Sequence, residues 1–156
     1  MSLFDPALPK NIMHQKQEKD FDCLITCAAM VSGHSYYDII GTIECLGLSV
    51  TKSLTVDNLR KVIARYAILI ENEPIKGEPK PGLYIETLPY IGSNKVVSSC
   101  HSIVVDRRDQ VTKVYDPYKG VKNKYYYSAI KYGDYSVLYN EPMVYSRLRM
   151  IDCNVI

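Results

Sequence analysis

A cysteine stands at the predicted start of a helix. The segment from Asp22 to about Ser32 is compact and apolar, places Cys23 in its first turn and is followed by Gly33, a typical helix stop. The first turn of a helix has unpaired N–H groups and the positive end of the helix dipole, so it favours a thiolate over a thiol. Because the thiolate is the reactive form, we predict that Cys23 is a catalytic nucleophile.

A histidine and a carboxylate face each other in a predicted hairpin. Residues 101–106 and 111–116 have the composition of two strands, joined by a polar turn centred on Arg108 and Asp109. This centre pairs Val105 with Thr112, Ile103 with Val114 and His101 with Asp116. A carboxylate opposite His101 would fix the tautomer of the ring and leave its other nitrogen free to take a proton.

Four residues together have the chemistry of covalent acyl transfer. Cys23 is the predicted nucleophile, His101 the base and Asp116 the group that orients the base. The oxyanion of the tetrahedral intermediate also needs hydrogen-bond donors. The backbone N–H of Cys23 supplies one, and the side-chain amide of Gln17, upstream in the same loop, supplies a second.

The residues around the nucleophile resemble those of a known peptidase family. Gln17, Asp22-Cys23 and Cys27-Ala28-Ala29-Met30-Val31 resemble the glutamine and the Asp-Cys-Gly-x-x-Cys-x-x-Met signature of the bacteriocin-processing (double-glycine leader) cysteine peptidases. That family belongs to the papain-like clan and forms the N-terminal peptidase domain of certain ABC exporters. Residues 46–49 and 54–59 look like the family's second-helix exit and third-helix start.

The likeness continues to Gly120 and covers most of the chain. Residues 80–83 precede the predicted strand that begins with His101. Asp116-Pro117 with Gly120 resembles the family's Asp-Pro-x-x-Gly motif. The resemblance implies a papain-like fold with the active site between a helical lobe and a sheet lobe. It also implies a Cys23, His101 and Asp116 triad with Gln17 as oxyanion donor, acting on a peptide or protein substrate.

The chain departs from the family beside the nucleophile. Leu24 replaces the usual glycine, so Leu24 and the neighbouring Asp22 are our expected substrate-binding residues. No transporter follows, which indicates a free-standing domain. A processing protease, an effector toxin that cleaves a foreign protein, a glutamine deamidase with the same acyl chemistry and a non-catalytic peptide-binding domain all remain open as functions. A cell-wall peptide hydrolase fits poorly with the missing export signal.

Zinc binding is the competing chemistry for these residues. Cys23 and Cys27 lie four residues apart and, with His101, could supply three ligands. There is no close Cys-x-x-Cys pair, and a zinc site would leave Gln17 and Asp116 without a role. We therefore expect neither a metal nor a cofactor.

The elements that must position these residues change in type along the chain. Helices are predicted over about residues 22–32, over 36–46 with a capping box of Ser35 and Asp38, and after the N-cap Thr55. Strands are predicted at residues 67–70, 82–88, 102–105, 112–115 and 143–148. Helices followed by a sheet predict the α+β class, with residues 1–16 as an N-terminal arm and 17–156 as one domain.

The composition and charge of the chain limit which partners and which cellular location we expect. With 156 residues, 47% apolar, and a net charge of +2, the chain gives no indication of nucleic acid as a partner. It has neither an apolar run of membrane-spanning length nor a signal peptide, so we expect it to be cytoplasmic where it is made. Export without such a signal, through an exporter or a secretion system, stays open. Of the five cysteines, Cys27, Cys45 and Cys153 are expected to be buried and reduced.

Overall fold

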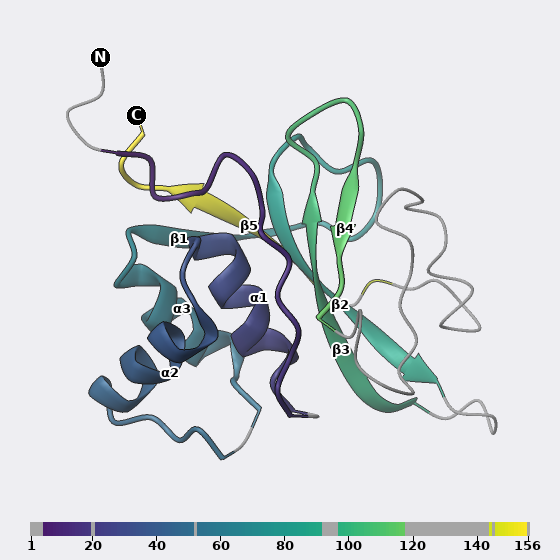
Figure 1. Ribbon diagram of the computed structural model, residues 1–156. Helices are drawn as coiled ribbons and strands as arrows, with labels where there is room; N and C mark the ends of the chain where they lie inside the picture. Colours follow the sequence, from purple (N-terminus) through teal and green to yellow (C-terminus); the bar gives the residue numbers. More distant parts are fainter. Residues whose placement is uncertain are drawn as a thin grey trace.

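The computed structural model describes residues 5–19, 21–51, 53–91, 97–117, 144 and 146–155. Within these ranges three helices are followed by a five-stranded antiparallel sheet, which confirms the predicted α+β class (Figure 1). The elements are α1 (Cys23–Ser32), α2 (Tyr36–Cys45), α3 (Val56–Ala64), β1 (Ile68–Glu73), β2 (Leu83–Ile91), β3 (Val97–Asp106), β4 (Lys113–Tyr115) and β5 (Ser146–Asp152). Gly120, and residues 143 and 145 of the last predicted strand, lie outside the described ranges.

The first helix is enclosed by the rest of the fold. Every residue of α1 from Leu24 to Ser32 is buried, and the helix contacts α2, α3 and β3. Figure 1 shows it between the other two helices and the sheet. The helix ends as predicted at Gly33, whose φ of 70° is the left-handed conformation that glycine adopts without strain.

Local caps begin the other two helices where the sequence predicts them. The Ser35 hydroxyl accepts from the Asp38 N–H at 3.1 Å, and the Asp38 carboxylate accepts from the Ser35 N–H at 3.2 Å. The Thr55 hydroxyl accepts from the Asn58 N–H at 3.1 Å. None of the helices in the described ranges is both long enough and apolar enough to span a membrane.

The sheet has two buried faces. Its strand order is β1-β5-β2-β3-β4. Because alternate residues of a strand point to opposite faces, one set packs with α1 and a second set forms a separate cluster. The first set includes Leu83, Ile85, Val104, Leu148 and Met150. The second set is Tyr84, Leu88, Ile103, Val105 and Val114.

The predicted register of the β3–β4 hairpin is wrong by two residues. Val105 pairs with Val114 rather than with Thr112. The reason lies on the other side of β3, where Arg107 and Gly82 exchange two backbone hydrogen bonds, at 2.8 and 3.3 Å, and prolong the β2–β3 ladder. The chain can turn only after Arg107, so the loop lies later than expected. A shift of two residues keeps every side chain on its predicted face.

Two of the three cysteines expected to be buried are exposed. Cys27 lies in the core on α1, as predicted. Cys45 is the last residue of α2, and Cys153 follows β5, and both are exposed. Apolar sequence neighbours were a poor guide here because both residues lie at the ends of elements, where the chain leaves the core.

A buried ion cluster crosses the sheet. The carboxylate of Glu86, on β2, is fully buried and accepts from Arg107 Nη2 at 2.7 Å and from Arg147 Nε at 3.5 Å. The guanidinium group of Arg147 also donates to the carbonyls of Pro74, Ile75 and Gly77. The cluster therefore ties β2, the end of β3, the start of β5 and a loop together.

Replacing Glu86 with alanine should lower the free energy of unfolding by about 3–5 kcal/mol, because it removes the carboxylate between two largely buried guanidinium groups. Urea unfolding of the variant measures this loss. The control is Glu71→Ala, which removes the half-exposed partner of Arg149 and should cost less than about 1 kcal/mol. Equal losses in the two variants would contradict the structural role of the cluster.

Candidate active site

The thiol of Cys23 lies beside the middle of β3. Cys23 is the first residue of α1, whose first turn is closed by the Thr26 N–H donating to the Asp22 carbonyl at 2.9 Å. The groups that lower the pKa of the Cys23 thiol are the ring of His101 and the backbone and side chain of Ser102, through hydrogen bonding and charge. Burial alone raises the pKa of Cys23, but these hydrogen bonds and the charge of His101 outweigh it and lower the pKa. The site therefore favours the thiolate.

His101 and Asp116 form a buried pair. Nε2 of His101 lies 2.6 Å from Oδ1 of Asp116, and the two residues are 2% and 1% exposed. Burial lowers the pKa of the ring, but the hydrogen bonds to Asp116 and Cys23, with their negative charges, outweigh it and raise the pKa of His101 to about 9. The ring is thus favoured as an imidazolium next to a thiolate.

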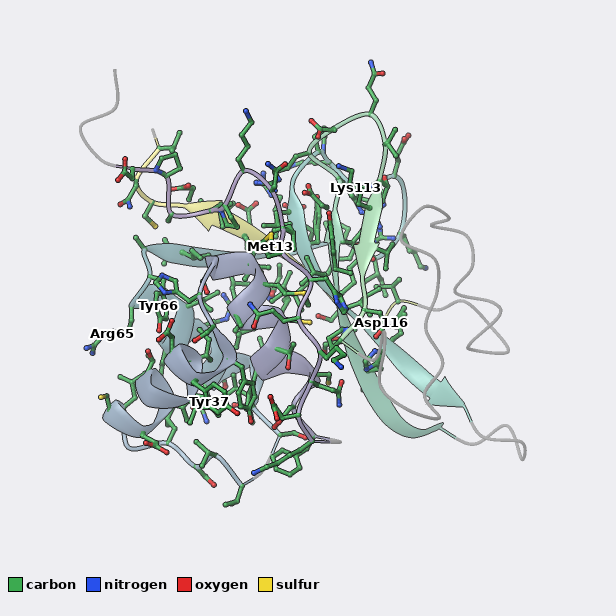
Figure 2. All side chains as sticks on the ribbon, in the orientation of Figure 1. Met13, Tyr37, Arg65, Tyr66, Lys113 and Asp116 are labelled. Carbon is green, nitrogen blue, oxygen red and sulfur yellow. The ribbon has the colours of Figure 1, made fainter. Side chains whose placement is uncertain are left out.

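The pair meets along a diagonal of the hairpin. The observed register, continued past Tyr115, places Asp116 opposite Ile103 rather than opposite His101. Diagonal neighbours on one face of a sheet are still within reach of long or aromatic side chains. Figure 2 shows Lys113 and Asp116 at the two ends of β4. The predicted partners therefore come together, although the predicted pairing is wrong.

Gln17 is held by its own loop. Its side chain is 6% exposed, and Nε2 donates to the Lys19 carbonyl at 2.7 Å. Because a carbonyl only accepts, this bond fixes which end of the amide is the nitrogen. One of the two amide hydrogens is used in this way, and the other is available for a second acceptor. The backbone N–H of Gln17 donates to the Pro117 carbonyl at 3.0 Å, next to Asp116.

The two residues expected to bind substrate are buried. Leu24 is 8% exposed and belongs to the core. Asp22 is fully buried, and its Oδ2 accepts from the Lys19 N–H at 3.0 Å and from the Tyr36 hydroxyl at 2.7 Å. The Lys19 contact closes the loop before Cys23, and the Tyr36 contact holds that loop against α2. Substrate contact by Asp22 and Leu24 stays a prediction, and the observed contacts give Asp22 a positioning role instead.

The sequence did not single out Ser102 or Tyr36. Strand alternation places Ser102 and His101 on opposite faces, so a contact of both with one thiol is not expected. Both the backbone and the side chain of Ser102 nevertheless lower the pKa of the thiol, and the backbone contribution could not be predicted from the residue type. Cys100, the neighbour of His101 on β3, is exposed. Burial and the nearby charge of Cys23 raise the pKa of Cys100.

The described ranges hold no group of three or more histidine, cysteine, aspartate or glutamate side chains placed to bind one metal ion. Cys27, the second thiol of the zinc alternative, is fully buried. Burial, with the charges of Cys23 and Asp116, raises the pKa of Cys27 well above its ordinary value. It is therefore a thiol, which is a poor metal ligand.

Comparison with known protein sequences adds no relative. No protein-family model matches the chain, and no curated protein sequence matches it. The resemblance to the bacteriocin-processing peptidases therefore rests on the residues quoted for it, and the function must be argued from the geometry of the site.

Proposed function

We propose that this protein is a papain-like cysteine peptidase that hydrolyses peptide bonds in a polypeptide substrate. The observation that carries the proposal is the buried His101–Asp116 pair, whose side chains lie 2.6 Å apart, together with the lowering of the Cys23 pKa by the ring of His101. The pKa of the thiol is lowered and that of the ring is raised to about 9, as nucleophilic attack by a thiolate requires.

The chemistry follows from the positions of the protons. Cys23 attacks the substrate carbonyl as a thiolate, and the His101 imidazolium gives its proton to the departing amine. A water molecule then attacks the thioester, with His101 taking a proton from it. Asp116 stays ionised throughout, since its task is to hold the ring and stabilise its positive charge.

The oxyanion is stabilised by two donors in this proposal. One is the backbone N–H of Cys23 at the positive end of α1. The other is the second amide hydrogen of Gln17, whose first hydrogen is bound by the Lys19 carbonyl. The arrangement of a nucleophile at a helix start, facing a histidine on an antiparallel sheet, also supports the papain-like fold.

The test is incubation of the full chain with a peptide library and with unfolded proteins, followed by mass spectrometry. New fragment pairs that together contain one added water support the proposal. A mass gain of about one unit without cleavage would replace it with glutamine deamidation, which uses the same acyl chemistry. Peptide binding without any mass change would replace it with a non-catalytic peptide-binding function.

Replacing Gln17 with alanine should lower kcat by about 10²- to 10³-fold with little change in KM, because the amide acts on the oxyanion and not on the bound ground state. Gln17→Glu should lose as much, since an ionised carboxylate cannot donate. The matched control is Gln15→Ala, which removes an arm glutamine that donates to the His34 carbonyl at 2.7 Å. Steady-state kinetics decide, and a Gln17→Ala rate within about threefold of wild type would contradict the assigned role.

A further inference from the structure

The N-terminal arm, residues 5–16, lies against both halves of the fold. Figure 1 shows it passing between α1 and the strands β3 and β4. Arg108, in the β3–β4 loop, donates to the Pro9 carbonyl at 2.7 Å and to the Lys10 carbonyl at 3.3 Å. Ile12 is 7% exposed and belongs to the main core. The arm is thus fixed immediately before the residues that follow Ile12.

The end of β4 needs hydrogen-bond donors from outside the sheet. The strand stops at Tyr115, and Pro117 has no N–H, so the β3–β4 ladder cannot continue. The chain just before α1 supplies the missing donors. His14 Nε2 lies 2.8 Å from the Asp116 carbonyl, and the Gln17 N–H donates to the Pro117 carbonyl. Because a carbonyl only accepts, Nε2 of His14 must carry the proton.

We propose that His14 is a positioning residue of the active site, which holds the Asp116 peptide so that its carboxylate stays aligned with His101. The inference rests on the proposed function. His14 contacts the backbone of Asp116 rather than its carboxylate, and both protonation states of the ring can donate through Nε2. Its contribution is therefore one of geometry rather than of charge.

The position of the donor nitrogen offers a sharp test. In glutamine the amide nitrogen reaches about as far as Nε2 of histidine, whereas in asparagine it reaches only about as far as Nδ1. His14→Gln should therefore retain the contact, and His14→Asn and His14→Ala should lose it. The ring is exposed, so all three variants are expected to fold, which thermal melting checks.

The experiment measures the pH dependence of Cys23 alkylation and the steady-state kinetics of the three variants and wild type. We expect His14→Ala and His14→Asn to raise the pH at which Cys23 becomes reactive and to lower kcat about fivefold, with KM nearly unchanged. His14→Gln should keep the pH dependence of Cys23 alkylation and kcat close to their wild-type values. If His14→Ala loses stability, the comparison of His14→Gln with His14→Asn at equal melting temperature decides instead.

The outcomes separate this inference from the proposed function. Wild-type behaviour of His14→Ala, or equal losses in the glutamine and asparagine variants, would overturn the role of His14 while leaving the peptidase proposal intact. A wild-type protein whose Cys23 has an ordinary thiol pKa would overturn both.

Discussion

Replacing Cys23 with alanine is expected to lower kcat/KM by at least about 10⁴-fold, because no other group in the site can form the thioester. Ser102 also lowers the pKa of the thiol, but its hydroxyl is hydrogen-bonded to the Thr87 hydroxyl at 3.2 Å, which is not a base. Cys23→Ser should lose about as much, since a serine hydroxyl is not ionised at neutral pH. Cleavage of the best peptide found in the library screen measures the effect.

The control for this loss is Cys45→Ala. Cys45 is an exposed thiol at the end of α2, so its removal changes the cysteine count without touching the site. It should leave kcat/KM within about twofold of wild type. If Cys23→Ala kept more than about one hundredth of the wild-type rate while remaining folded, Cys23 would not be the nucleophile.

Replacing Asp116 with asparagine is the second large effect. The amide keeps the size of the side chain and a possible acceptor, but it removes the negative charge 2.6 Å from the ring. The pKa of His101 should then fall from about 9, and the thiolate of Cys23 should lose its stabilising partner. We expect kcat/KM at neutral pH to fall roughly 10³- to 10⁴-fold.

The pH profile separates this explanation from simple misfolding. In the proposed mechanism, activity needs a Cys23 thiolate and a protonated His101, so wild-type activity should rise through the lowered thiol pKa and decline as the ring deprotonates near pH 9. In Asp116→Asn the descending limb should move to lower pH. Asp109→Asn, the same change at an exposed loop residue, is the control. An unchanged descending limb in Asp116→Asn would contradict the orienting role.

Local signals predicted the elements well. The caps at Ser35 and Thr55 and the glycine stop at Gly33 act within one helical turn, so a few neighbouring residues determine them. The side of the strand on which His101 and Asp116 lie also followed from alternation alone. That is why the partners were found although the register was wrong.

Contacts between distant parts of the chain were not predictable from residue types. The hairpin register depends on the backbone pairing of Arg107 with Gly82, twenty-five residues earlier. The exposure of Cys45 and Cys153 depends on where the chain leaves the core. His14, in the N-terminal arm, contacts the backbone carbonyl of Asp116, and such a contact cannot be predicted from residue types because every residue has a carbonyl.

The central claim is that Cys23 is a thiolate held by His101, and competitive alkylation tests it most directly. The full chain is treated with limiting iodoacetamide over a range of pH below the ordinary thiol pKa, and the labelled cysteines are mapped by mass spectrometry. Cys23 is only partly exposed, whereas Cys45, Cys100 and Cys153 are exposed. The account predicts that Cys23 is labelled first, and that His101→Ala abolishes this preference. Labelling that follows exposure, with Cys23 after the three exposed cysteines, would contradict it.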